Sequence, residues 1–220
     1  MSIPRLHLTT DDGVLADPDF TRLAAGLVGD HGPGLALHLR GRSTSARRLL
    51  DLAQTLVPQA DRAGTMLLVN DRLDVALAAG AAGVHLGSRS MPPGDARSLL
   101  GDRTLGCSVH SAEGAHAVSP WIDFVFLGTI YPTPSHAGEP GAGPALVAAT
   151  AARATVPILA IGGISVDRVE AVVAAGAHGV AVIRGIWSAA DPAAEAGRYL
   201  EMLNASHATR RVVAGEGSEA

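Results

Sequence analysis

The sequence predicts a single (β/α)₈ TIM barrel with a parallel eight-stranded sheet. Short apolar runs alternate strictly with longer Ala- and Leu-rich segments along the 220 residues, and such alternation indicates βαβ units. Hydrophobic residues make up 47% of the chain and aromatic residues only 3%, so we expect a core of Ala, Val, Leu and Ile. These residues are typical of buried parallel sheets. The length also fits one barrel.

The predicted strands are short apolar runs that end at polar residues or glycine. In chain order they cover residues 5–9, 35–40, 65–70, 83–87, 104–108, 122–128, 157–162 and 179–184. The predicted helices cover residues 17–29, 43–57, 72–79, 92–100, 112–119, 144–154, 166–175 and 192–204. Ser43, Ser111 and Ser165 stand at helix starts, where a hydroxyl oxygen can accept a hydrogen bond from the first turn.

We expect one barrel domain over residues 1–204, followed by a flexible tail over residues 205–220. No shift in composition divides the first segment, whereas the tail is short, polar and Gly-rich, which is typical of a frayed terminus. The Ala-rich helices permit close packing between subunits, so a homodimer is compatible with the sequence.

Charge and cysteine content exclude several classes of protein. The net charge is −4 and basic residues are scattered, which argues against nucleic-acid binding. The single cysteine, Cys107, excludes an internal disulfide framework and a multi-cysteine metal site. Neither an apolar leader nor a run of about 18 apolar residues occurs, so we expect no secretory signal and no membrane span. A reducing cytoplasm is the expected location.

Two glycine-containing pairs mark the most promising site. Gly162 and Gly163 follow the seventh predicted strand, and Arg184 and Gly185 follow the eighth. Barrels of this kind often bind phosphate there, because backbone N–H groups and a helix N-terminus converge on the anion. We therefore predict a phosphate site at these residues. The alternative is that the two glycines only form a tight turn.

Other polar residues also follow predicted strands. His38 and Arg40 are two residues apart on one strand, so they face the same side and could hold an anion. The alternative is a solvated strand end. Asp71 follows a strand end and could bind a divalent cation. It could equally cap the helix that follows.

Six motifs then point to a known superfamily. In chain order they are Leu6-His7-Leu8-Thr9-Thr10-Asp11, Asn70-Asp71-Arg72, Gly83-Val84-His85-Leu86-Gly87, Ser108-Val109-His110-Ser111, Gly128-Thr129-Ile130-Tyr131-Pro132-Thr133 and Ala160-Ile161-Gly162-Gly163-Ile164. Together they resemble the superfamily of thiamine-phosphate synthases and thiazole tautomerases. The resemblance implies one of two activities. The synthase joins a pyrimidine pyrophosphate to a thiazole phosphate with Mg²⁺, and the tautomerase moves a proton in a thiazole carboxylate phosphate without metal.

The sequence departs from the synthase pattern at residues that would bind the pyrophosphate and its magnesium ions. Asp71 matches the first magnesium ligand, but Ser90 stands at the second, and His136 stands where synthases carry a pyrophosphate-binding Lys. The loss of a carboxylate and of a positive charge should weaken stabilisation of the departing anion. Arg42 and Arg89 could compensate in part, because Arg also binds phosphate well.

Two other motifs look like the tautomerase forms, namely His38-x-Arg40 and the segment around Ser108. Thr129 departs from that pattern, since tautomerases carry their acid/base His there. We expect His136 to replace it, because imidazole titrates near neutral pH, with His38 and Arg40 as further catalytic residues. The alternative is that His136 is an exposed loop residue. The predicted substrate-binding residues are Asn70, Ser108, His110, Thr129, Thr133 and Ser135.

We therefore expect a thiazole tautomerase-like enzyme of thiamine biosynthesis that binds a small phosphorylated thiazole and needs no cofactor. The first alternative is a thiamine-phosphate synthase that uses Mg²⁺ held by Asp71. The second is a barrel that binds thiazole or thiamine phosphates without catalysis.

Overall fold

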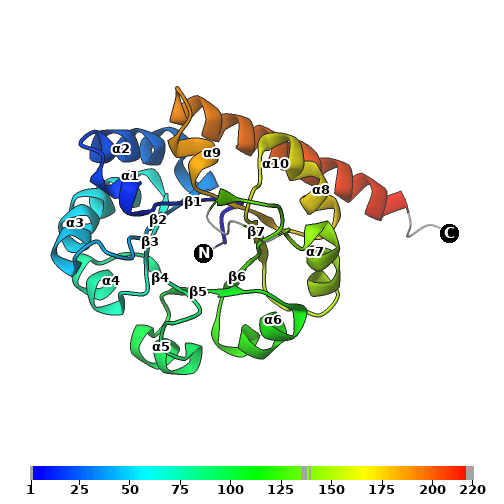
Figure 1. The fold of residues 1–220 in the computed structure, drawn as a ribbon, viewed down its shortest axis with the longest axis horizontal. Coiled ribbons are helices and arrows are strands. Elements are labelled where there is room, and N and C mark those ends of the chain that lie inside the picture. The colour runs from blue at the N-terminus through cyan, green and yellow to red at the C-terminus, as the bar shows by residue number, and fades with distance from the viewer. Residues whose placement is uncertain (1, 135–137, 139, 217–220) are drawn as a thin grey trace.

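The described residues form a closed barrel of eight parallel strands, which confirms the predicted fold class (Figure 1). The computed structural model describes residues 2–134, 138 and 140–216, with side chains up to residue 210 in the last helix. The strands are β1 (Leu6–Thr9), β2 (Leu35–Leu39), β3 (Met66–Asn70), β4 (Gly83–Leu86), β5 (Thr104–Val109), β6 (Phe124–Leu127), β7 (Ile158–Ile161) and β8 (Gly179–Val182). The pairing of Leu6 in β1 with Val180 in β8 closes the barrel.

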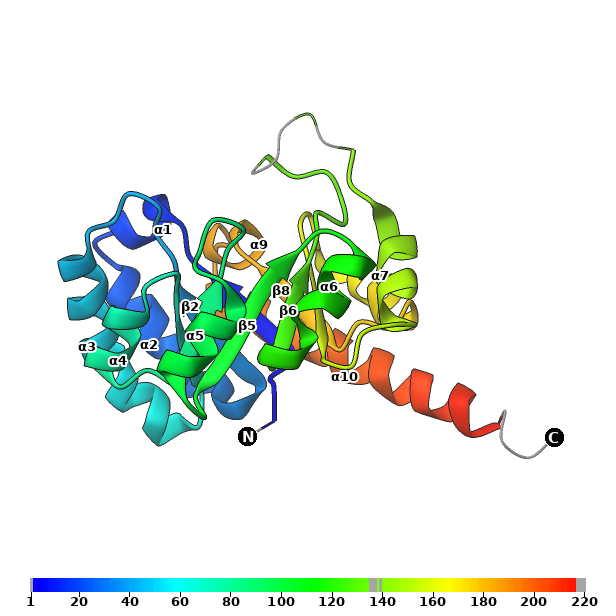
Figure 2. The same ribbon diagram turned by 90° about the horizontal axis from the view of Figure 1, so that it is seen from below.

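Helices cover the outside of the barrel (Figures 1 and 2). They are α1 (Asp12–Ala16), α2 (Phe20–His31), α3 (Ala46–Ala63), α4 (Leu73–Ala79), α5 (Pro93–Leu100), α6 (Ala112–Val118), α7 (Gly143–Ala151), α8 (Val169–Ala174), α9 (Arg184–Trp187) and α10 (Pro192–Glu216). The short helices α1 and α9 differ from the prediction. They have five and four residues, which is too few for an apolar period to show in the sequence.

Helix α10 is longer than predicted. It was expected over residues 192–204 but continues to Glu216, through most of the segment for which we expected a tail. Tyr199 and Leu203 in its first half are 1% and 0% exposed, so this half is anchored on the barrel. The last turns extend past the barrel (Figures 1 and 2). Among the residues described, no helix is both long and apolar enough to cross a membrane.

The serine caps follow the prediction at one of three positions. Ser111 caps α6, and its hydroxyl accepts a hydrogen bond from the N–H three residues further on. At α3 the cap is Ser45 rather than Ser43: the Ser45 hydroxyl accepts a hydrogen bond from the N–H of Arg48, and the N–H of Ser43 donates to the carboxylate of Asp12. Ser165 makes no side-chain cap hydrogen bond, so that prediction is wrong.

The barrel interior differs from the expected aliphatic core. His7, His38 and His85 lie in it with Phe124 and Phe126, and each of these side chains is at most 2% exposed. Their ring contacts join β1, β2, β4 and β6, which are not all neighbours, so the side chains must meet across the interior. Leu, Val and Ala fill the shell between strands and helices, as predicted. Three histidines and two phenylalanines therefore fill the part of the interior that we expected to be aliphatic.

Candidate functional site

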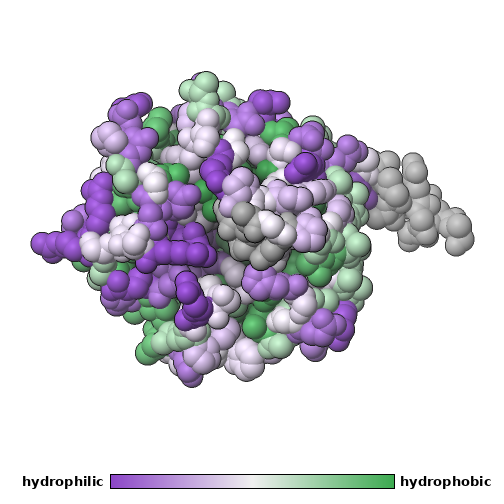
Figure 3. All heavy atoms as spheres, viewed as in Figure 1, coloured by the Kyte–Doolittle hydropathy of each residue, from purple (hydrophilic) through white to green (hydrophobic). Residues whose placement is uncertain are grey.

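The mouth of the barrel is the end at which all the strands terminate. Parallel strands in a closed barrel present their carboxyl ends together, and the loops after them surround one opening. Figure 3 views this end, where hydrophilic side chains gather near the centre and toward the side of α3 and α4. The predicted site residues therefore lie at the ends of β2 to β4, of β5 and β6, and of β7 and β8.

Asp71 is turned toward the loop after β4. Its backbone is left-handed, with a φ of 62°, and its N–H donates to the carbonyl of His85 at 2.9 Å. Its carboxylate oxygen Oδ1 accepts hydrogen bonds from the N–H of Gly87, at 2.8 Å, and from the hydroxyl of Ser90. Helix α4 has no side-chain cap, so the helix-cap alternative for Asp71 is not what forms. The carboxylate is instead exposed at the mouth.

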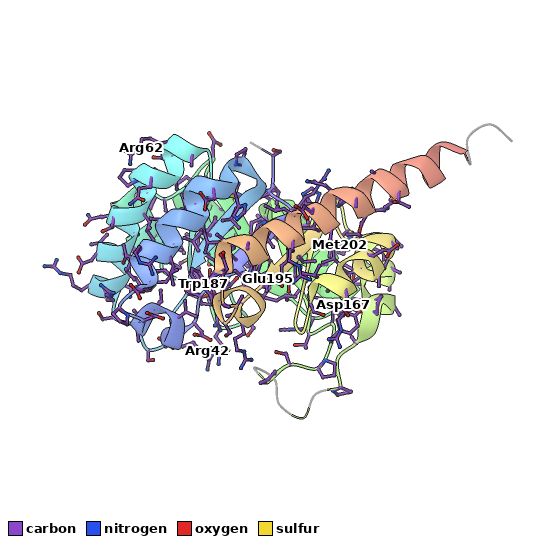
Figure 4. The ribbon with its side chains drawn as sticks, turned by 90° about the horizontal axis from the view of Figure 1, so that it is seen from above. Arg42, Arg62, Asp167, Trp187, Glu195 and Met202 are labelled. Atoms are coloured by element: carbon purple, nitrogen blue, oxygen red, sulfur yellow. The ribbon has the colours of Figure 1, made fainter. Side chains whose placement is uncertain are left out.

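The loop after β2 carries Arg40 and Arg42 and is held by Asp12. The Asp12 carboxylate accepts hydrogen bonds from the backbone N–H of Arg42, at 3.0 Å, and from Thr44 Oγ1, at 2.7 Å. Partial burial would raise the pKa of Asp12, but the hydrogen bonds from Thr44, Ser43 and Arg42 lower it to about 2. Arg42 projects on the mouth side of the barrel (Figure 4).

Arg40 lies deeper than Arg42. Burial and the neighbouring Arg42 lower its guanidinium pKa, whereas the carboxylates of Asp71, Asp11 and Asp12 oppose this. Because Arg remains charged near neutral pH, Arg40 brings a half-buried positive charge toward Asp71. The loops after β2 and β3 therefore combine two guanidinium groups with an exposed carboxylate.

Gly162 and Gly163 lie after β7 in tight contact with the loop after β6. Their φ angles are 100° and 60°. A Cβ on Gly162 would lie 2.7 Å from Thr129 Cγ2, and one on Gly163 would lie 2.6 Å from the carbonyl oxygen of Pro132. The tight-turn alternative is thus part of the explanation for these glycines. It leaves the phosphate prediction open, because close packing and an exposed backbone can coexist at one turn.

Arg168 supports this turn. Its Nη1 donates to the carbonyl of Gly163 at 2.7 Å, and its guanidinium lies 4.6 Å from the centre of the Tyr131 ring. Arg168 was absent from the predicted site because it belongs to a short 3₁₀ segment after β7, where no motif marks it. Its stacked and hydrogen-bonded guanidinium fixes the relative position of the loops after β6 and β7.

Arg184 and Gly185 begin the short helix α9 after β8. The strands β7 and β8 are paired neighbours, so their loops lie side by side at the mouth. A Cβ on Gly185 would lie 2.7 Å from the hydroxyl of Tyr199, which itself donates to the carbonyl of Ile164 at 2.9 Å. The structure therefore brings the four predicted phosphate-binding residues to one edge of the mouth.

The remaining predicted residues come from β5 and β6. His110 is exposed, and its Nδ1 donates to the carbonyl of Gly128 at 2.6 Å. Ser108 Oγ lies 2.8 Å from His85 Nε2, and Ser108 is only partly buried, so it can also face the mouth. Thr129 and Thr133 are half-buried in the loop after β6. Ser135 and His136 lie outside the described residues.

His38 lies beneath the mouth rather than in it. Its side chain is 0% exposed, and burial lowers its pKa to about 3. Its ring nitrogens lie 2.8 Å from His7 Nδ1 and 3.3 Å from Asn70 Oδ1. Asn70 stands at the carboxyl end of β3 and is 7% exposed, so it joins His38 to the end of the strand.

A Mg²⁺ ion at this mouth would need ligands from substrate phosphates as well as from the protein. Within the described ranges, no three His, Cys, Asp or Glu side chains form a group that could hold a metal. Asp71 and Ser90 offer a carboxylate and a hydroxyl side by side, which are hard oxygen ligands. Mg²⁺ usually takes one or two carboxylates and completes its shell with water and substrate phosphates. These two residues fit that pattern.

Comparison with known proteins identifies similar chains. The family model described as "Thiamine monophosphate synthase" matches residues 9–186. The thiamine-phosphate synthase of Salinispora arenicola is 39% identical over 205 residues, which cover 92% of this chain and 98% of that protein. The thiamine-phosphate synthase of Mycolicibacterium vanbaalenii is 39% identical over 209 residues, or 91% of this chain and 95% of that protein.

A solved structure supports the fold. The thiamine phosphate pyrophosphorylase from Pyrococcus furiosus superposes with a TM-score of 0.80 at 24% identity. The match covers 92% of this chain and 96% of that chain. At this level of identity it supports the barrel architecture and no more.

These similarities contradict the expected tautomerase activity. The relatives that match almost the whole chain at 39% identity are named synthases, so the tautomerase prediction is wrong and its synthase alternative is favoured. The motif His38-x-Arg40 misled the prediction for a physical reason. His38 is buried in the interior, so a His at this position reports on the filling of the barrel rather than on proton transfer at the mouth.

Proposed function

This chain belongs to the thiamine monophosphate synthase family, and from that premise we propose that it joins hydroxymethylpyrimidine pyrophosphate to thiazole phosphate and releases pyrophosphate. The observation that carries the proposal is that the residues suited to bind anions lie in two groups at the mouth. β3 and β7 are four strands apart in a closed barrel of eight, so the groups after β2 to β4 and after β7 and β8 face each other across the opening. Two phosphorylated substrates need such an arrangement.

The reaction balances without an oxidant or an external acid. The thiazole nitrogen forms a C–N bond with the methylene carbon of the pyrimidine, while the bond from that carbon to the pyrophosphate oxygen breaks. Pyrophosphate leaves with the electron pair, and the thiazole becomes a thiazolium. The main demand on the protein is to stabilise the developing negative charge on the leaving group and to hold both substrates in line.

The group after β2 to β4 would bind the pyrophosphate. Arg40 and Arg42 supply positive charge, and Asp12 keeps the loop that carries Arg42 in place. Asp71 and Ser90 would hold Mg²⁺, which neutralises phosphate charge when it is bound. The guanidinium groups matter more here than in a site with two magnesium carboxylates, since Ser90 supplies no charge.

The group after β7 and β8 would bind the phosphate of the thiazole. Gly162 and Gly163 bring the backbone close to the anion, and Arg184 adds a positive charge beside Gly185. Arg168 cannot reach into this group as a free cation, because it is engaged with Gly163 and Tyr131. It would instead hold the backbone in the shape that the phosphate needs.

The remaining predicted residues come from the ends of β3, β5 and β6. Asn70 and Ser108 are at the carboxyl ends of β3 and β5, and His110 holds the backbone of Gly128. We propose that Asn70 and Ser108 contact the pyrimidine and that Thr129 and Thr133 face the departing anion. The roles of Ser135 and His136 stay predictions.

Turnover of defined substrates tests this proposal. The purified chain is incubated with hydroxymethylpyrimidine pyrophosphate and thiazole phosphate, with Mg²⁺ or with EDTA, and products are separated by chromatography. We expect thiamine phosphate and pyrophosphate in equal amounts, formed only with Mg²⁺. Binding of both substrates without product would overturn the proposal and favour the non-catalytic alternative.

A further inference from the structure

A row of hydrogen-bonded side chains crosses the barrel interior and ends at the mouth. The carbonyl oxygen of Pro4 lies 3.1 Å from His7 Nε2, and His7 Nδ1 lies 2.8 Å from His38 Nε2. His38 Nδ1 lies 3.3 Å from the side-chain amide of Asn70. Both histidines are 0% exposed and Asn70 is 7% exposed, so water does not compete for these contacts.

The Pro4 carbonyl at one end of the row fixes which ring nitrogens of His7 and His38 carry protons. A carbonyl oxygen can only accept, so His7 must carry its proton on Nε2. Nδ1 of a neutral His7 is then an acceptor, and His38 must donate to it from Nε2. His38 Nδ1 is in turn left as an acceptor, and it needs a donor from Asn70.

The amide of Asn70 can supply that donor. Rotation of an amide by 180° exchanges its oxygen and its nitrogen at almost no steric cost, so the hydrogen-bond partners decide which atom faces which way. With the nitrogen toward His38, every contact in the row pairs one donor with one acceptor. The amide oxygen of Asn70 is then turned away from His38.

The competing arrangement requires a buried cation. If the oxygen of Asn70 faced His38, one of the two imidazoles would have to carry a second proton. Burial lowers the pKa of both His7 and His38. The neighbouring His38 and His85 lower the pKa of His7 further. An unpaired charge at this depth costs far more than an amide rotation.

We propose that His7 is a positioning residue that acts through His38 to hold the oxygen of Asn70 as a hydrogen-bond acceptor for the pyrimidine substrate. This rests on the proposed function, because it assigns the substrate contact of Asn70. Asn70 directly precedes Asp71, so the substrate concerned is the one that carries pyrophosphate. The row of hydrogen bonds begins at the Pro4 carbonyl, at the end of the barrel opposite the mouth, and ends at Asn70.

The tautomers of the wild-type protein test the proposal directly. Nitrogen-15 NMR of side-chain imidazoles distinguishes the two neutral tautomers and the imidazolium form. We expect His7 and His38 both to be neutral with the proton on Nε2. A proton on Nδ1 of His38, or an imidazolium at either residue, overturns the proposal.

A matched pair of variants tests the consequence for catalysis. His7→Leu and His7→Asn have side chains of the same shape, and both lose the ring contact to Phe124 and the bond to Pro4. Only His7→Asn keeps an oxygen that can accept from His38. We expect His7→Leu to raise KM for the pyrimidine substrate about tenfold with a smaller change in kcat, and His7→Asn to restore most of it.

The outcomes separate this proposal from the proposed function. KM for thiazole phosphate should stay within about twofold in both variants, because that substrate binds across the barrel. Equal losses in His7→Leu and His7→Asn would mean that His7 only fills space, and would overturn the positioning role. If the wild-type chain makes no thiamine phosphate, the proposed function fails while the tautomer measurement still decides the arrangement of the row.

Discussion

The carboxylate of Asp12 accepts a hydrogen bond from the hydroxyl of Thr44 at 2.7 Å, so the loop after β1 is tied to the loop after β2. The same carboxylate also binds the backbone N–H groups of Arg42, Ser43 and Thr44. One acidic side chain thereby organises the segment that presents Arg42 to the mouth. This contact has consequences for stability as well as for substrate binding.

The first prediction concerns the pH dependence of that contact. The pKa of Asp12 is lowered from 3.8 to about 2, so its carboxylate stabilises the fold at pH values above 3.8 and the contribution is lost as the pH falls through 2. After allowance for solvent screening, Asp12→Asn should cost roughly 1 kcal/mol at pH 7. Urea unfolding of both proteins between pH 7 and pH 2 measures this. A difference that stays constant over this range would contradict the assignment.

The second prediction concerns Asp71. Asp71→Asn should lower kcat/KM for the pyrimidine substrate by about 100-fold, because Mg²⁺ loses its carboxylate. Asp74→Asn is the matched control, since Asp74 is also exposed but is already paired with Arg72. Steady-state kinetics at several Mg²⁺ concentrations compare the two. If Asp74→Asn causes the same loss, or if Mg²⁺ dependence is unchanged in Asp71→Asn, the proposed magnesium site is wrong.

The third prediction concerns Gly163. Gly163→Ala should raise KM for thiazole phosphate at least tenfold, because the new Cβ would lie 2.6 Å from the carbonyl of Pro132 and displace the turn. Gly80→Ala is the control, as Gly80 also has a positive φ, of 72°, but its Cβ would meet nothing within 4 Å. It should cost about 1 kcal/mol of stability and leave both KM values alone. Equal effects of the two variants on KM would show that Gly163 has no special role at the phosphate.

Much of the fold could be predicted from the sequence alone. The apolar runs are short and separated by regular helical segments, so strand order and the parallel sheet follow from their alternation. Helix starts were predicted less accurately: Ser43 and Ser45 both suit an N-cap by residue type, and the structure shows that Ser45 is the cap of α3. The long helix α10 was predicted to end at residue 204 because the segment that follows looked short, polar and Gly-rich in the sequence.

The site was harder to predict because it depends on how deeply each side chain is buried in the barrel and on contacts between loops. Alternation along β2 places His38 and Arg40 on the same side but cannot tell that the first lies at 0% exposure and the second at the rim. Arg168 was missed because its contacts with Gly163 and Tyr131 form only when the loops after β6 and β7 pack together. The tautomerase motif was misread for the same reason, since a pattern of residue types does not report whether an imidazole can reach a substrate.

Two phosphate-bearing substrates should bind at once, on opposite sides of the mouth. Titration of thiazole phosphate into the protein by calorimetry, with and without saturating Mg²⁺ and pyrophosphate, tests this most directly. We expect one thiazole phosphate to bind per chain in both conditions, with Kd changed by no more than about threefold. Displacement of thiazole phosphate by pyrophosphate in direct competition would mean a single anion site, and would contradict the two-sided mouth on which the proposed synthase activity rests.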